Sequence, residues 1–116
     1  MRELLYEAAR HYKKGKALAD RGDVTGAMVA FEQALRDLHA VKPQRMRDVL
    51  LAQVYLSRYQ IAGDNDRDAA LGDLRRGYSY ARTTREPIVR RLAEELWRRS
   101  VEQAKARHAA LAETEQ

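Results

Sequence analysis

Residues 15–34, GKALADRGDVTGAMVAFEQA, decide the fold of this chain. Gly22 and Asp23 separate two runs in which apolar residues recur every three or four positions, as they do along one face of a helix. Gly22 can take the left-handed conformation that ends a helix, and Asp23 is a favoured N-cap for the next helix. Small residues at 15, 27 and 34 can receive the large side chains of Leu18 and Phe31 where the two helices approach each other. The stretch therefore predicts two antiparallel helices joined by a tight turn.

The helical spacing continues on both sides of this stretch and predicts an all-α fold. No segment alternates apolar and polar residues as a strand does, and β-branched residues are scarce. Hydrophobic residues make up 45% of the chain and charged residues 34%, which fits a protein with a packed core and a polar surface. Five helices are expected, over residues 2–20, 24–41, 44–62, from the acidic run at 64–68 to about 82, and 87–111. The third is apolar nearly all the way round, so we expect it at the centre of the fold.

The Gly-Asp pair occurs twice, because Gly63 and Asp64 follow the first pair after 41 residues. Each pair lies between two helices that carry small and large apolar residues in the same order. The first copy has Gly15, Leu18, Ala27, Phe31 and Ala34, and the second has Ala52, Leu56, Tyr59, Ala70, Leu74 and Gly77. This order resembles the tetratricopeptide repeat (TPR) family, in a variant with longer helices. His11 and Lys14 depart from the pattern, since the family usually has Trp and Leu at those positions.

The resemblance implies a single domain over residues 1–116, built as a short α-solenoid of antiparallel helical hairpins. Its two TPR-like units would cover about residues 2–41 and 44–83, and a C-terminal helix over about 87–112 would cap the open end. Two units are fewer than a repeat stack usually needs. The last helix is therefore expected either to cap its own chain or to pair with a second copy in a homo-oligomer. An unrelated antiparallel helical bundle is the alternative architecture.

The resemblance also implies a protein–protein interaction module, a small scaffold or adaptor. The family's groove is lined by the first helix of each hairpin, and here it is expected to hold a peptide or helix of a partner with some acidic character. The expected contacts are Tyr12, Lys13, Lys16, Gln53, Ser57 and Gln60. Some members of the family clamp a peptide's terminal carboxylate with a fixed set of Lys and Asn. That set is not reproduced, because Lys16 stands at an Asn position and Tyr12 and Gln53 replace Lys and Asn. Tyr12 and Gln53 could instead pack against neighbouring helices.

The charge distribution supports a rival function. The net charge is +5, and most of the excess lies in residues 42–85. Tyr78 and Tyr80 lie among the arginines of the fourth expected helix, and Arg with Tyr can grip phosphates and stack on bases. The candidate phosphate contacts are Arg75, Arg76, Arg82 and Arg85. Nucleic-acid binding is therefore the alternative function, and a self-assembling structural subunit is a third.

No pattern in the sequence predicts catalysis, a cofactor or a metal site, so we expect no enzyme activity. The chain has no Cys, which excludes disulfides, thiolate zinc sites and iron–sulfur clusters. His11, His39 and His108 are not three or four positions apart, as a helical metal pair requires. The acidic run 64–68 resembles a calcium loop, but Ala69 stands where that loop needs Gly.

The sequence predicts a cytoplasmic protein that does not enter membranes. Acidic residues lie near Met1, where a signal peptide would need an apolar core. The longest uncharged run, residues 49–57, is about half of what a membrane span requires.

Overall fold

The computed structural model describes residues 2–62 and 66–114, and all regular structure in them is α-helical. The helices are α1 (Arg2–Asp20), α2 (Val24–His39), α3 (Arg45–Ile61), α4 (Arg67–Thr83) and α5 (Pro87–Thr114). The expected all-α fold of five helices is confirmed. Of the described helices, none combines the length and the apolar character needed to cross a lipid bilayer.

The turn between α1 and α2 has the predicted geometry. Gly22 has a φ of 83°, in the left-handed region, and the Asp23 N–H donates to the Leu18 carbonyl at 2.9 Å. The Asp23 carboxylate then accepts from the Gly26 N–H at 2.9 Å and caps α2. The two helices can therefore reverse direction within three residues.

In the first hairpin a small residue of α1 receives a large residue of α2. Gly15 lies under the fully buried Phe31, and a Cβ at Gly15 would come 2.5 Å from the Phe31 Cε1 atom. Other buried side chains of this hairpin complete one side of the core: Ala8, Ala27, Ala34, Leu35 and Leu38. The small-on-large contact expected from the sequence is confirmed for this pair.

In the second hairpin the small residue is on the other helix. Gly77 of α4 lies against Leu56 of α3, and a Cβ at Gly77 would come 2.7 Å from the Leu56 Cδ2 atom. Asp66 caps α4 by accepting from the Ala69 N–H at 3.1 Å. The expected turn residues Gly63 and Asp64 lie outside the described residues.

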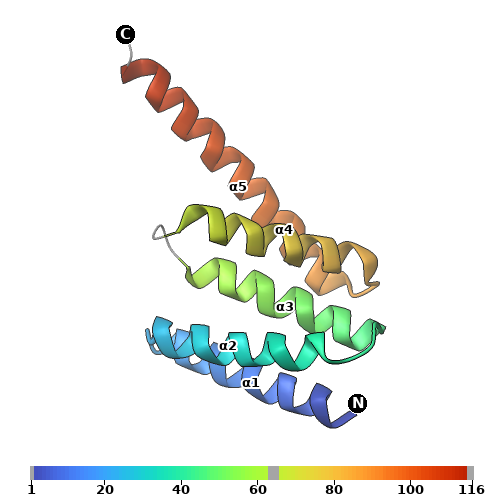
Figure 1. Ribbon diagram of the computed structural model, residues 1–116. Helices are drawn as coiled ribbons and strands as arrows, with labels where there is room; N and C mark the ends of the chain where they lie inside the picture. The colour runs from blue at the N-terminus through green and yellow to red at the C-terminus, as the bar shows by residue number, and fades with distance from the viewer. Residues whose placement is uncertain (1, 63–65, 115–116) are drawn as a thin grey trace.

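The helices pack in sequence as pairs (Figure 1). The central helix α3 contacts both helices of the first hairpin as well as α4, and α5 contacts both helices of the second hairpin. Within the described residues, the backbones of α1 and α2 come close to neither α4 nor α5. This stepwise packing is consistent with a solenoid of helical hairpins.

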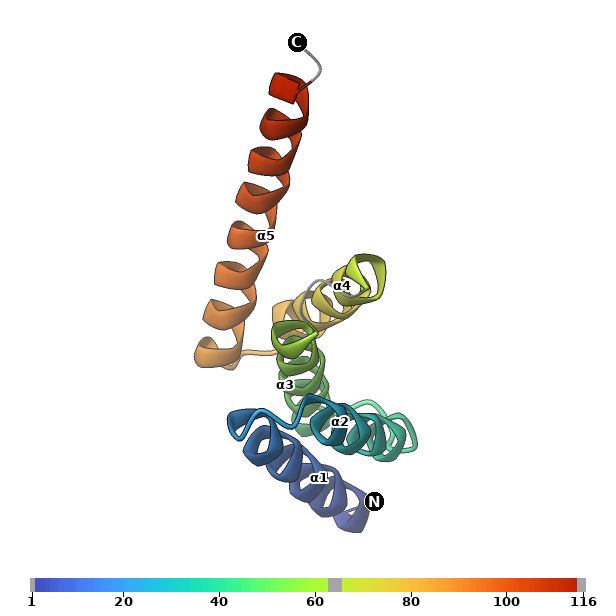
Figure 2. The ribbon, with the colours of Figure 1, turned by 90° about the vertical axis from the view of Figure 1, so that its left-hand side faces the viewer.

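The last helix covers the second hairpin with its first half only. Val89, Ala93 and Leu96 are buried there, and the Trp97 ring lies 4.8 Å from the Tyr78 ring. Every residue of α5 from 101 to 114 is exposed, and the helix runs away from the hairpins (Figure 2). The sequence predicted a cap over the whole last helix, whereas only its first half covers the second hairpin. The element also continues beyond the expected end near residue 111, because an Ala-rich segment has high helix propensity.

Candidate functional site

The predicted groove between α1 and α3 is partly closed by its own residues. The Tyr12 hydroxyl lies 3.3 Å from the Ser57 Oγ atom, and the Tyr12 ring lies 6.0 Å from that of Phe31. Ser57 is only 4% exposed. Its hydroxyl is buried at the α1–α3 contact, so the structure does not present Ser57 to a partner there. Tyr12 packs there too.

The other predicted groove residues do not form one site. Lys13 and Lys16 are exposed on α1, and Gln53 is half-buried on α3. Gln60 is exposed near the end of α3, where it lines a cleft with α5. Residues that the sequence pattern assigned to one groove therefore lie on two different surfaces of the structure.

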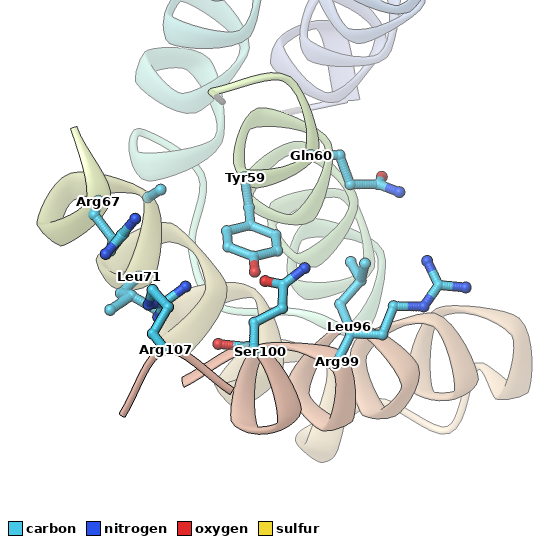
Figure 3. A pocket seen from close by; sticks show the side chains of 10 residues that line it. Tyr59, Gln60, Arg67, Leu71, Leu96, Arg99, Ser100 and Arg107 are labelled. Carbon is cyan, nitrogen blue, oxygen red and sulfur yellow. The ribbon is translucent and has the colours of Figure 1, made fainter. Parts of the chain in front are cut away.

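The cleft beside Gln60 is formed where α5 leaves the second hairpin. It has a volume of about 360 Å³ between α3, α4 and α5, and we call it the arginine cleft. Its lining residues are Tyr59, Gln60, Arg67, Ala70, Leu71, Leu96, Arg99, Ser100, Gln103 and Arg107. Figure 3 shows Arg67 and Arg107 on one side, Arg99 on the other, and Tyr59 between them.

Three helices position these side chains. The end of α3 supplies Tyr59, and the first turn of α4 supplies Arg67. Along α5, Ser100, Gln103 and Arg107 follow Leu96 at spacings of three and four, so they continue the face that packs on the hairpin. This face turns from apolar to polar at the point where α5 loses contact with α4.

The arginine cleft combines positive charge with an apolar floor. The Arg99 Nε atom donates to the Glu95 carboxylate at 3.0 Å, and hydrogen bonds from Arg98 and Arg99 lower the pKa of Glu95. No carboxylate of the described residues lies within ion-pair distance of the Arg67 or Arg107 guanidinium. Ala70, Leu71 and Leu96 form the apolar lining. The arrangement can bind an anionic group attached to an apolar body.

The four arginines predicted to contact phosphate are separated in the structure. Arg75 and Arg82 come together in a second cleft of about 270 Å³ with Tyr78, Ser79, Thr83 and Trp97, which we call the Trp97 cleft. Arg76 pairs with Asp73 at 3.7 Å and lies over the Tyr55 ring. Arg85 lines a third cleft, beside the start of α3. Only one pair of the four therefore shares a surface.

A buried ion pair joins α3 to α4 and was not foreseen from the sequence. Arg58 donates to both carboxylate oxygens of Asp73, at 2.8 and 2.7 Å. The Asp73 side chain is 5% exposed and that of Arg58 24%. Hydrogen bonding to Asp73 raises the pKa of Arg58. Because the two charges satisfy each other, this pair links α3 to α4 and offers no free group for binding, and loss of one partner would leave the other buried without its counter-charge.

The histidines lie in separate places. The His11 Nδ1 atom lies 3.0 Å from the Asp37 carboxylate between α1 and α2, and the His39 Nε2 atom lies 3.0 Å from the Tyr55 hydroxyl. Burial lowers the pKa of His39 and raises that of Tyr55. In residues 2–62 and 66–114, no three His, Asp or Glu side chains gather so that they could hold a metal ion.

Sequence reasoning missed Arg67, Arg99 and Arg107 because the cleft depends on the angle at which α5 crosses the hairpin. One signal was available: after Leu96, polar residues replace apolar ones on the packing face of α5.

Comparisons of the chain with protein-family models, with curated proteins and with solved structures find no match.

Proposed function

We propose that this chain is a small cytoplasmic adaptor that holds an acidic segment of a partner protein in the arginine cleft. The observation that carries the proposal is the grouping of Arg67, Arg99 and Arg107 around an apolar floor. Guanidinium groups bind carboxylates in a bidentate way, and the floor accepts the apolar part of the bound segment. The binding surface thus lies beside α5, whereas the sequence placed it between α1 and α3.

The architecture supports an interaction module of the TPR-like kind. Helices pack as consecutive pairs, and each pair has a glycine under a large side chain, Gly15 under Phe31 and Gly77 under Leu56. Such packing produces a rigid platform whose outer helices present side chains at fixed spacing. A rigid platform lowers the conformational entropy lost on binding a partner.

The test is the recovery of partner proteins by the immobilised chain from the cells that make it. We expect Arg67→Gln/Arg107→Gln to weaken the affinity for a specific partner by about a hundredfold or more, because each of the two lost charge-assisted hydrogen bonds costs about 1.5–3 kcal/mol. The matched control is Lys14→Gln/Arg21→Gln, which removes the same charge from exposed positions near the end of α1.

A second double variant, Tyr12→Ala/Gln53→Ala, shows which of the two candidate surfaces binds the partner. If Tyr12→Ala/Gln53→Ala abolishes recovery while the Arg67/Arg107 variant does not, the partner binds in the groove between α1 and α3. Equal recovery by all variants, with correct folding shown by circular dichroism, would contradict a specific adaptor role for either surface.

The Trp97 cleft favours nucleic-acid binding as a second candidate function. The Arg82 guanidinium lies 5.9 Å from the centre of the Tyr78 ring, and Trp97 is 38% exposed beside it. Trp97 is the only Trp, so its fluorescence would report a stacked base. Quenching by a short oligonucleotide that weakens steeply with salt would support this function. The absence of quenching at low salt would exclude it.

A further inference from the structure

The second half of α5 is exposed to solvent, and in the described residues it approaches the hairpins at the arginine cleft, which Gln103 and Arg107 line. All its residues from Val101 to Thr114 are exposed, and both ribbon views show it leaving the hairpins (Figures 1 and 2). An isolated helix of this length is only marginally stable in water. A partner that covered it would therefore stabilise it.

A mainly apolar stripe, which includes the polar His108, runs from Trp97 along the exposed half of α5. Its members follow each other at spacings of four and three, the spacing of a coiled-coil seam. They are Trp97, Val101, Ala104, His108 and Leu111, and we call them the α5 stripe. Val101 is 41% exposed and Leu111 63%. Because Trp97 packs on Tyr78, the stripe continues outward from the core of the molecule.

The charges beside the α5 stripe are positive. At about 100° per residue, Lys105 lies next to the stripe on one side and Arg107 on the other. Within the exposed half, the acidic residues Glu102 and Glu113 lie on the opposite face of the helix; Glu94, which precedes Trp97 and lies outside this half, is on the side of the stripe. Arg107 also lines the arginine cleft, so the basic flank of the stripe and the cleft form one surface.

We propose that the α5 stripe binds an α-helix of a partner protein whose own apolar stripe is flanked by Glu or Asp. This inference rests on the proposed function, because the helix is the acidic segment that also reaches the arginine cleft. Charge decides between this occupant and a second copy of the chain. A second copy would bring basic or neutral flanks against the same basic flanks, and like charges at these positions repel.

The test uses two synthetic peptides of about four heptads with Leu at both seam positions. One peptide has Glu at the flanking positions and the other has Lys. Binding to the full chain is followed by peptide anisotropy and by Trp97 fluorescence. We expect the Glu peptide to bind at least about tenfold more tightly than the Lys peptide, with a preference that falls as salt rises.

Two variants that leave Arg67, Arg99 and Arg107 intact locate the site. Val101→Ser/Leu111→Ser should weaken binding of the Glu peptide by about tenfold or more, since it removes apolar burial. Lys105→Glu should reduce the ratio of the affinity for the Glu peptide to the affinity for the Lys peptide. All three positions are exposed, so circular dichroism should show unchanged folding.

The outcomes separate this inference from the adaptor proposal. Three results would overturn the inference that the stripe binds a helix. They are equal binding of the two peptides, no binding of either peptide, and no effect of Val101→Ser/Leu111→Ser on binding. Sedimentation that shows a dimer lost in that variant would make a second copy the occupant and also overturn it. If partner recovery still depends on Arg67 and Arg107 in those cases, the adaptor proposal stands alone.

Discussion

At Gly15, the absence of a single methyl group sets the distance between the first two helices. Phe31 is fully buried and its ring fills the space that a Cβ would need. The sequence indicated this contact, because Gly in a helix interior lowers helix propensity and is expected there only for a packing reason. The same reasoning did not find the reversed contact in the second hairpin, where Leu56 is the large residue and Gly77 the small one.

We predict that Gly15→Ala destabilises the protein. Overpacking of a buried site costs about 1–3 kcal/mol, and Ala in place of Gly returns about 1 kcal/mol through helix propensity, so the net loss should be up to about 2 kcal/mol. Gly72→Ala is the matched control, because its nearest neighbour is the flexible end of Arg76. That variant should gain about 0.5–1 kcal/mol. Urea unfolding measures both, and equal stability of the two variants would contradict close packing at Gly15.

A second prediction concerns the ion pair of Arg58 and Asp73. Arg58→Met leaves a buried carboxylate with only Arg76 nearby, at 3.7 Å, and should cost about 3 kcal/mol. Asp73→Asn keeps a hydrogen-bond acceptor and leaves the partly exposed Arg58 in reach of water, so it should cost about 1 kcal/mol. Thermal unfolding of the two variants measures the loss of stability in each. A larger loss for Asp73→Asn would show that burial of the carboxylate is not the dominant effect.

At the scale of the elements, caps and spacing were sufficient to place the helices. Gly22, Asp23 and Pro87 mark boundaries that the structure reproduces, because each acts through the local backbone. The arginine cleft could not be placed in this way. It depends on the crossing of α5 with the second hairpin, and that crossing follows from side-chain packing between helices, which local backbone signals do not determine. Of its lining residues, only Gln60 was among the predicted contacts.

We predict that the second half of α5 contributes nothing to the stability of the hairpins. Deletion of residues 104–116 should change the free energy of unfolding by less than about 0.5 kcal/mol, because every described residue of that segment is exposed. The helical signal in circular dichroism should fall in proportion to the residues removed. A loss of several kcal/mol would mean that the segment packs against the fold in solution.

At the scale of the whole molecule, the shape is elongated because α5 extends beyond the hairpins. The principal extents are 58 × 31 × 20 Å, and the radius of gyration of the Cα atoms is 15.6 Å. A compact chain of this length would have a radius of gyration of about 13 Å. The difference comes from a helix whose second half is held by one end only.

Small-angle scattering tests this shape on the free chain. We expect a radius of gyration about 2 Å above the compact value for the full chain, and a value close to ~13 Å after deletion of residues 104–116. If α5 folded back over the α4 surface, the full chain would already have the compact value and would cover the arginine cleft and the α5 stripe. A dimer would also have a radius of gyration above the compact value. The forward scattering gives the molecular mass in the same experiment and so distinguishes a dimer from an extended monomer. Only an extended monomer leaves both surfaces free for the acidic helix that we propose.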